Sequence, residues 1–141
     1  MWPKNYSIGV FQVKLCCTFQ TERSQMHGDS TEFWFKLDRL VAVSNLNIDR
    51  PKGTSHPRYP SFVYPLDYGY LENTRSGDGG DIDVWIGSLS SKKVTAIICS
   101  VDLEKRDTEI KILLGCTFEE NQAILDIQNI GSQSAILLVR K

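Results

Sequence analysis

From residue 62 to its end, the chain consists mostly of short apolar runs separated by turn residues. β-Branched and aromatic residues are frequent in these runs, which favours strands over helices. Several short strands at close spacing are typical of a small closed barrel. We therefore expect a mainly β (α+β) fold, a small closed OB-like β-barrel with one or two flanking helices. The expected strands are 46–49, 62–64, 81–89, 94–103, 109–116 and 135–139.

Two segments have the pattern of a helix. Ser30 or Thr31 is a suitable N-cap for the first helix, and Thr117 with Glu120 forms a capping box for the second. The expected apolar face of the first helix is Phe33, Trp34, Leu37, Leu40 and Val41. The expected buried stripe of the second is Ala123, Ile124 and Ile127.

The 141 residues are enough for one domain with a single core. Residues 1–30 differ from the rest, and we expect them to be an N-terminal extension, either poorly ordered or peripheral, followed by a domain over residues 31–141. The four cysteines form no CxxC pair, which argues against a zinc site or a disulfide framework. The same cysteine pattern indicates a reducing cytosol, so we expect a cytoplasmic protein. No 18-residue apolar span occurs, so we expect no membrane partner.

A glycine-rich turn carries three aspartates and leads directly into an apolar run. If the strand begins near Asp81, its period of two places Asp81 and Asp83 on one face, with Asp78 reaching back from the turn. Carboxylates held close together repel one another, and such a cluster usually persists because a hard cation such as Mg²⁺ neutralises it. The pattern favours phosphate chemistry. The alternative is an exposed turn whose aspartates accept hydrogen bonds from the local backbone.

A second acidic pair, Asp102 and Asp107, lies at the expected tip of a hairpin. It repeats the D-x4-D separation of Asp78 and Asp83, again at strand ends. A second pair with the same spacing strengthens the prediction of a shared acidic site. The alternative is a solvated, charged turn.

The loop over residues 49–60 is basic and holds three prolines. Arg50, Lys52 and Arg58 are candidate donors to phosphate oxygens, and the prolines would keep the loop on a fixed course. His56 is a candidate general base, although its place between a serine and a proline favours an ordinary loop histidine. The alternative for the whole segment is a basic surface loop. No GxxxxGK[ST] motif occurs, so the chain is not a P-loop NTPase.

Five elements, in the same order, resemble the soluble inorganic pyrophosphatases. The run Tyr64–Tyr70 is similar to the family's YPxNYGY segment, with Asp67 in place of the asparagine. The residues that match the family's aspartate signature and its later acidic pair are Asp78, Asp83, Asp102 and Asp107. The upstream matches are Asp49, Pro51, Arg58 and Tyr59. The resemblance covers roughly residues 46–115, about half of the chain.

The chain also departs from the family pattern. Gly80 stands where the family has the middle aspartate that is thought to activate water, and we hypothesise that Asp81 takes over after a shift of one residue. Pro60 replaces a glutamate. Glu109 stands at the position of the family's lysine, and Lys111 follows two places later. The resemblance is therefore to a divergent, shortened relative.

The resemblance implies Mg²⁺-dependent hydrolysis of inorganic pyrophosphate to orthophosphate by a metal-activated water. The implied catalytic residues are Asp83, Asp81, Asp78 and Tyr68. The implied substrate-binding residues are Arg58 and Tyr64, and we expect Lys52 of the basic loop and Lys111 to bind phosphoryl oxygens beside them. The implied metal ligands are Asp78, Asp83, Asp102, Asp107, Asp49 and Asp67. It also implies a small-molecule substrate and a homo-oligomer.

Two other functions stay open. Gly80 and Pro60 favour a pyrophosphatase-like barrel that binds a phosphorylated small molecule or Mg²⁺ without turnover. A nucleic-acid-binding barrel would use the tyrosines as stacking platforms. The net charge of −1 and the many aspartates argue against it, so we expect no nucleic-acid partner.

Overall fold

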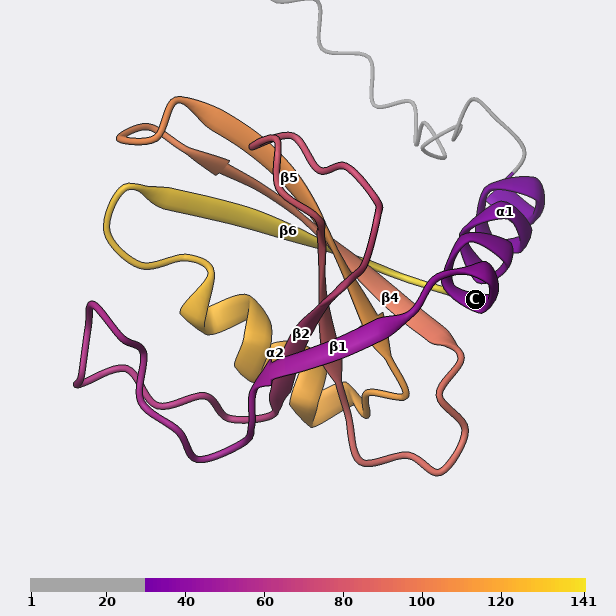
Figure 1. Cartoon of the computed structure of the whole chain (residues 1–141), viewed down its shortest axis with the longest axis horizontal. Helices are drawn as coiled ribbons and strands as arrows, with labels where there is room; N and C mark the ends of the chain where they lie inside the picture. The colour runs from indigo at the N-terminus through magenta and orange to yellow at the C-terminus, as the bar shows by residue number, and fades with distance from the viewer. Residues whose placement is uncertain (1–29) are drawn as a thin grey trace, which may run out of the picture.

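The computed structural model describes residues 30–141, which form a six-stranded sheet and two helices (Figure 1). The strands are β1 (Leu46–Arg50), β2 (Asp67–Leu71), β3 (Ile82–Ile86), β4 (Val94–Asp102), β5 (Asp107–Leu114) and β6 (Gln133–Val139). Their order across the sheet is β1-β2-β3-β5-β4-β6. Within residues 30–141, β3 and β5 are parallel and the other neighbouring strands are antiparallel. The mainly β, α+β class is confirmed.

The sheet has two edges, β1 and β6, and no pairing in the described part of the chain joins them. The predicted closure into a barrel is therefore not confirmed.

Neither helix in this part of the chain combines the length and the apolar character that crossing a bilayer requires. The predicted extension over residues 1–30 lies, apart from Ser30, outside the described residues.

The two helices, α1 (Ser30–Val43) and α2 (Phe118–Ile127), pack on opposite faces of the sheet (Figure 1). Trp34 of α1 is buried against Val84 and Ile112 on one face. Ile124 of α2 is buried against Trp85 on the other. Alternation along each strand divides its side chains between these two cores. We call the second face the α2 side.

Both helices were predicted from sequence, and both are confirmed. Thr117 Oγ1 accepts a hydrogen bond from Glu120 N at 3.2 Å, and Glu120 Oε2 accepts one from Thr117 N at 2.9 Å. This closes the capping box that the sequence predicts. Two details of the predicted apolar faces are wrong, because Phe33 and Ala123 are exposed. Each lies beside the buried stripe of its helix and not within it.

The strand predictions fail between residues 62 and 71. The run 62–64 is not a strand, although Val63 forms an isolated bridge with Ser55. Pro60 and Pro65 flank this run, and proline cannot donate to a ladder. The strand here is β2, where Gly69 lets β1 approach closely. A Cβ at Gly69 would lie 2.0 Å from the Asn47 carbonyl oxygen.

The third predicted strand, 81–89, is shorter in the structure. It ends at Ile86, and Gly87 N then donates to the Leu114 carbonyl as the chain turns towards β4. β3 begins at Ile82, one residue after Asp81, and the Asp81 carboxylate accepts a hydrogen bond from Thr74 N in the preceding turn. The predicted placement of Asp81 and Asp83 on one strand face is therefore not confirmed.

Candidate functional site

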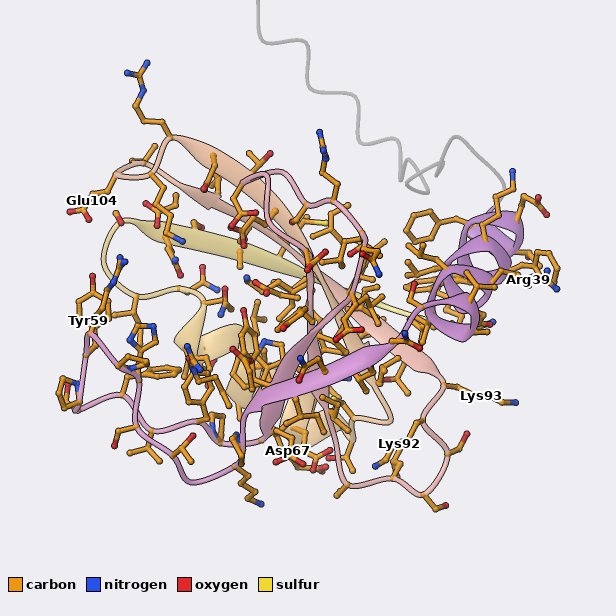
Figure 2. All side chains as sticks on the ribbon, viewed as in Figure 1. Arg39, Tyr59, Asp67, Lys92, Lys93 and Glu104 are labelled. Atoms are coloured by element: carbon orange, nitrogen blue, oxygen red, sulfur yellow. The ribbon has the colours of Figure 1, made fainter. Side chains whose placement is uncertain are left out.

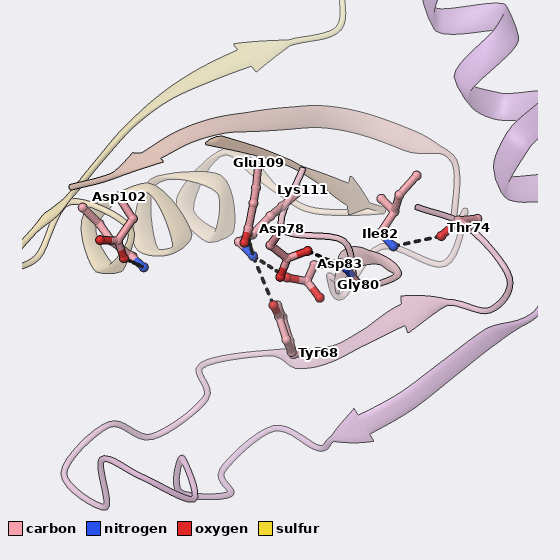
Figure 3. A network of polar contacts seen from close by, with 10 residues as sticks. Tyr68, Thr74, Asp78, Gly80, Ile82, Asp83, Asp102, Glu109 and Lys111 are labelled. Atoms are coloured by element: carbon pink, nitrogen blue, oxygen red, sulfur yellow. Dashed lines mark hydrogen bonds and ion pairs between the residues drawn. The ribbon is translucent and has the colours of Figure 1, made fainter. Parts of the chain in front are cut away.

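Asp83 and Lys111 come together because β3 and β5 are parallel neighbours. The same register aligns Trp85 with Leu113, two residues further along each strand, and both of these belong to the core under α2. Since side chains alternate along a strand, Asp83 and Lys111 also point to the α2 side. A carboxylate and an ammonium group that are far apart in sequence thus meet on this face (Figure 3).

The period of two on β5 continues this row of charges towards the β4–β5 turn. Asp107, Glu109 and Lys111 share one side of β5. Asp102 of β4 lies directly opposite Asp107. We call Asp83, Lys111, Glu109, Asp107 and Asp102 the carboxylate row. Figure 3 shows Asp83 and Asp102 well separated along it.

Lys111 is the centre of one polar network, which we call the Lys111 network and which also contains Asp83, Glu109 and Tyr68. Its Nζ donates to Glu109 Oε2 at 2.6 Å, to Asp83 Oδ2 and to the Tyr68 hydroxyl at 3.3 Å. The side chains of Lys111 and Glu109 are 9 % and 8 % exposed, and that of Asp83 is 28 % exposed. The ammonium group therefore bridges two carboxylates in a largely buried position.

The network keeps Lys111 charged and Tyr68 protonated. Burial alone would lower the pKa of Lys111, but the carboxylates of Asp83 and Glu109 outweigh it and raise this pKa above its ordinary value. Burial raises the pKa of Tyr68, and Asp83 adds to the effect. Tyr68 is thus a hydroxyl donor or acceptor at neutral pH and not a phenolate base.

Aromatic rings support the Tyr68 side of this network. The Tyr68 ring centroid lies 4.6 Å from that of Trp85 and 5.5 Å from that of Tyr64. Tyr64 is buried, so it has no free ring face on which a base could stack. His56 Nδ1 accepts hydrogen bonds from Arg58 N and Tyr59 N, which matches the interpretation of His56 as an ordinary loop histidine.

Asp102 belongs to a different network, at the β4–β5 turn. Its Oδ1 accepts hydrogen bonds from Glu104 N at 2.8 Å, Lys105 N at 3.2 Å and Ser132 Oγ at 2.9 Å. Its Oδ2 accepts one from Gln133 Nε2 at 3.2 Å. These bonds, led by the one from Lys105 N, lower the pKa of Asp102 despite its burial. The carboxylate closes the turn and ties it to β6.

The glycine-rich turn also uses its aspartates locally. Asp78 Oδ1 accepts a hydrogen bond from Gly80 N at 2.9 Å (Figure 3). Asp81 Oδ1 accepts one from Thr74 N at 3.0 Å. This is the hydrogen bonding that the sequence analysis gave as the alternative to a metal site. Asp78 and Asp81 are not brought into the Lys111 network. Their catalytic and metal-binding roles stay predictions.

The upstream loop brings together some of the predicted residues. Asp67 Oδ1 accepts a hydrogen bond from Lys52 N at 2.8 Å. Asp49 forms an ion pair with Arg50, 3.1 Å apart, at the irregular end of β1. The side chains of Lys52 and Arg58 are on the exposed surface of this loop. Figure 2 shows Tyr59, the neighbour of Arg58, at the outer margin of the molecule and Asp67 in a different part of it.

The described residues contain no group of three or more acidic, histidine or cysteine side chains placed to share a metal ion. A Mg²⁺ ion does not need such a group, since it is often held by one or two carboxylates together with substrate phosphates. Asp83 and Glu109 form a pair of this kind, because both direct an oxygen to the position of one positive charge. The donor chemistry fits Mg²⁺, provided that Lys111 leaves this position.

Glu109 is the residue that the sequence analysis missed as a site residue. It stands at the position of a lysine in the pyrophosphatase pattern, so the alignment of motifs did not select it. The signal was the period of two in Asp107, Glu109 and Lys111. That period places all three side chains on one side of a strand.

The fold is similar to that of an inorganic pyrophosphatase from Neisseria gonorrhoeae. The similarity has a TM-score of 0.50 with 18 % sequence identity, and covers 67 % of this chain and 80 % of that one. At this identity the likeness concerns the fold alone. No family model and no curated protein matches the sequence.

Proposed function

We propose that this chain hydrolyses a phosphoanhydride, with inorganic pyrophosphate as the default substrate, in a Mg²⁺-dependent reaction at the Lys111 network. One observation carries the proposal: Asp83 and Glu109 converge from neighbouring strands on a single positive charge. The fold similarity to an inorganic pyrophosphatase and the order of sequence motifs support it.

Asp83 and Glu109 are the residues that would hold the metal. When bound there, Mg²⁺ would lower the pKa of a water molecule and neutralise charge on the phosphoryl groups. Asp107 lies next along the carboxylate row and adds negative charge to the same face. We do not place Asp102 among the main metal ligands, because its two oxygens already accept hydrogen bonds from the turn and from β6.

The chain's own donors act on the anionic substrate. Tyr68 keeps its proton, so its hydroxyl can donate to a phosphoryl oxygen. Lys111 keeps its charge and supplies a second donor close by. We propose that Arg58 and Lys52 of the exposed loop contact the outer phosphate, as the sequence predicts. These donors stabilise charge that develops on the leaving group.

The test is orthophosphate release from pyrophosphate, measured with and without Mg²⁺. We expect Asp83→Asn to lower the rate about a hundredfold, which corresponds to about 2.7 kcal/mol in the barrier. Asp126→Asn is the matched control, since Asp126 lies on the exposed side of α2 and bonds to Gln122. A wild-type rate equal to the blank, or an equal rate in Asp83→Asn, contradicts the proposal.

A second candidate function is binding of a phosphorylated small molecule without turnover. Gly80 favours it, because no carboxylate stands at this position and the neighbouring Asp78 and Asp81 are engaged by backbone N–H groups. Calorimetric titration with pyrophosphate distinguishes the two functions. Binding without orthophosphate release supports the second candidate, and binding with release supports the first. Assembly into a homo-oligomer, a cytoplasmic location and the absence of a nucleic-acid partner stay predictions.

A further inference from the structure

Lys111 is in a position where it cannot serve the substrate without first giving up a partner. An ammonium group has three N–H donors. Asp83, Glu109 and Tyr68 accept from Lys111, so the group is fully engaged. A phosphoryl oxygen can receive a hydrogen bond from Lys111 only after one of these bonds breaks.

The same ammonium group also occupies the place that the proposed metal would take. Asp83 Oδ2 and Glu109 Oε2 both point at Lys111 Nζ, and the side chains of Glu109 and Lys111 are largely buried. Two carboxylates facing one another in such a place need a cation, because burial of unpaired charge is costly. Lys111 supplies that cation from within the chain, so the described fold is complete without a metal.

We propose that Lys111 is an internal cation that competes with the divalent metal for Asp83 and Glu109, and that metal binding releases its ammonium group towards the phosphoryl oxygens. The inference rests on the proposed function, because it concerns the same two carboxylates. The lysine side chain has a flexible four-carbon stem, so rotation about its own bonds is the motion that would move the ammonium group.

The competition has a size that can be estimated. If Lys111 occupies the position in about 90 to 99 % of molecules, the apparent metal affinity falls about ten- to a hundredfold. The coupling is also reciprocal. A substrate phosphate that binds the released ammonium group stabilises the metal-bound state, so metal and substrate strengthen one another's binding.

The first experiment measures Mg²⁺ binding by calorimetry without any substrate. We expect Lys111→Met to bind Mg²⁺ at least about tenfold more tightly than the wild type, as the loss of an internal competitor requires. Adding Asp83→Asn to this variant should abolish the gain. Lys93→Met is the matched control, since Lys93 is exposed and projects outward in Figure 2. Equal affinity in the wild type and Lys111→Met, or no binding to either, overturns the proposal.

A second experiment uses the wild type and so does not depend on how well a variant folds. Acetic anhydride labels free lysine amines, and mass spectrometry locates the labels. Lys111 should be protected in EDTA and should become labelled when Mg²⁺ is added without pyrophosphate, while Lys93 is labelled under both conditions. Protection of Lys111 that persists at saturating Mg²⁺ overturns the proposal.

These outcomes can be separated from those of the hydrolysis assay. If Lys111→Met binds Mg²⁺ more tightly than the wild type and the wild type releases no orthophosphate, the internal-cation proposal stands and the hydrolysis proposal is rejected. If the wild type releases orthophosphate but binds Mg²⁺ with the same affinity as Lys111→Met, the hydrolysis proposal stands and the internal-cation proposal is rejected.

Discussion

Asp83 and Asp102 lie on the same side of the same sheet, and both match aspartates of one sequence pattern, yet they have different partners. Asp83 faces a buried ammonium group that it shares with Glu109. Asp102 accepts hydrogen bonds from two backbone N–H groups and two polar side chains. The first contact is between charges, and the second closes a turn.

The difference teaches that the partner, more than the residue type, decides what an aspartate can do. A backbone N–H cannot leave a turn without unfolding it, so Asp102 is committed to structure. The ammonium group of Lys111 is on a flexible stem, and under our proposal a metal ion can take its place. Asp83 is therefore the aspartate of this pair that can take part in chemistry.

The largest expected effect on stability comes from Lys111→Met in buffer without metal. Removing one partner of a buried ion pair leaves the others uncompensated, and we expect a loss of about 3 kcal/mol in the free energy of unfolding. Urea denaturation in EDTA measures it. Adding Glu109→Gln should recover part of the loss, because it removes one of the two unpaired charges. An unchanged free energy of unfolding would mean that the Lys111 network contributes little.

A smaller effect is expected from Asp102→Asn, and it should depend on pH. Because the folded protein lowers the pKa of Asp102, its carboxylate stabilises the fold above the ordinary pKa of 3.8. That contribution is lost as pH falls through the folded-state pKa. The deficit of Asp102→Asn relative to the wild type should therefore shrink below about pH 3.8. Urea denaturation at several pH values tests this, and a deficit that stays constant into acid contradicts it.

The smallest effect is expected from Thr117→Ala, which removes the N-cap of α2. Loss of such a cap costs about 1 kcal/mol. Thr117 does not touch either acidic network, so the variant separates general destabilisation from loss of the site. Its Mg²⁺ affinity should equal that of the wild type. A changed Mg²⁺ affinity would show that weakening α2 is enough to disturb the Lys111 network.

Local features of the fold were predictable from sequence, and long-range ones were not. The capping box at Thr117 depends on residues three apart, and the structure contains it as predicted. The strand β2 was missed because a glycine within it and two prolines before it are untypical of strands. Gly69 is nevertheless required there, because Asn47 of β1 leaves no room for a Cβ.

The site was predictable only in part. Sequence motifs selected Asp83 and Lys111 separately, but their contact depends on the parallel pairing of β3 with β5, which crosses a long stretch of chain. Glu109 was missed for the same reason, because it becomes a site residue only by sharing Lys111 with the distant Asp83. The local bonds of Asp78 and Asp81 were foreseen as alternatives, since turn chemistry is short-range.

The most direct test of the central claim compares Asp83→Asn and Asp102→Asn in one assay, orthophosphate release from pyrophosphate with saturating Mg²⁺ at neutral pH. We predict that Asp83→Asn loses nearly all of the wild-type rate, while folded Asp102→Asn keeps most of it. Equal losses in the two variants, or a rate that survives in Asp83→Asn, would contradict the assignment of the chemistry to the Lys111 network.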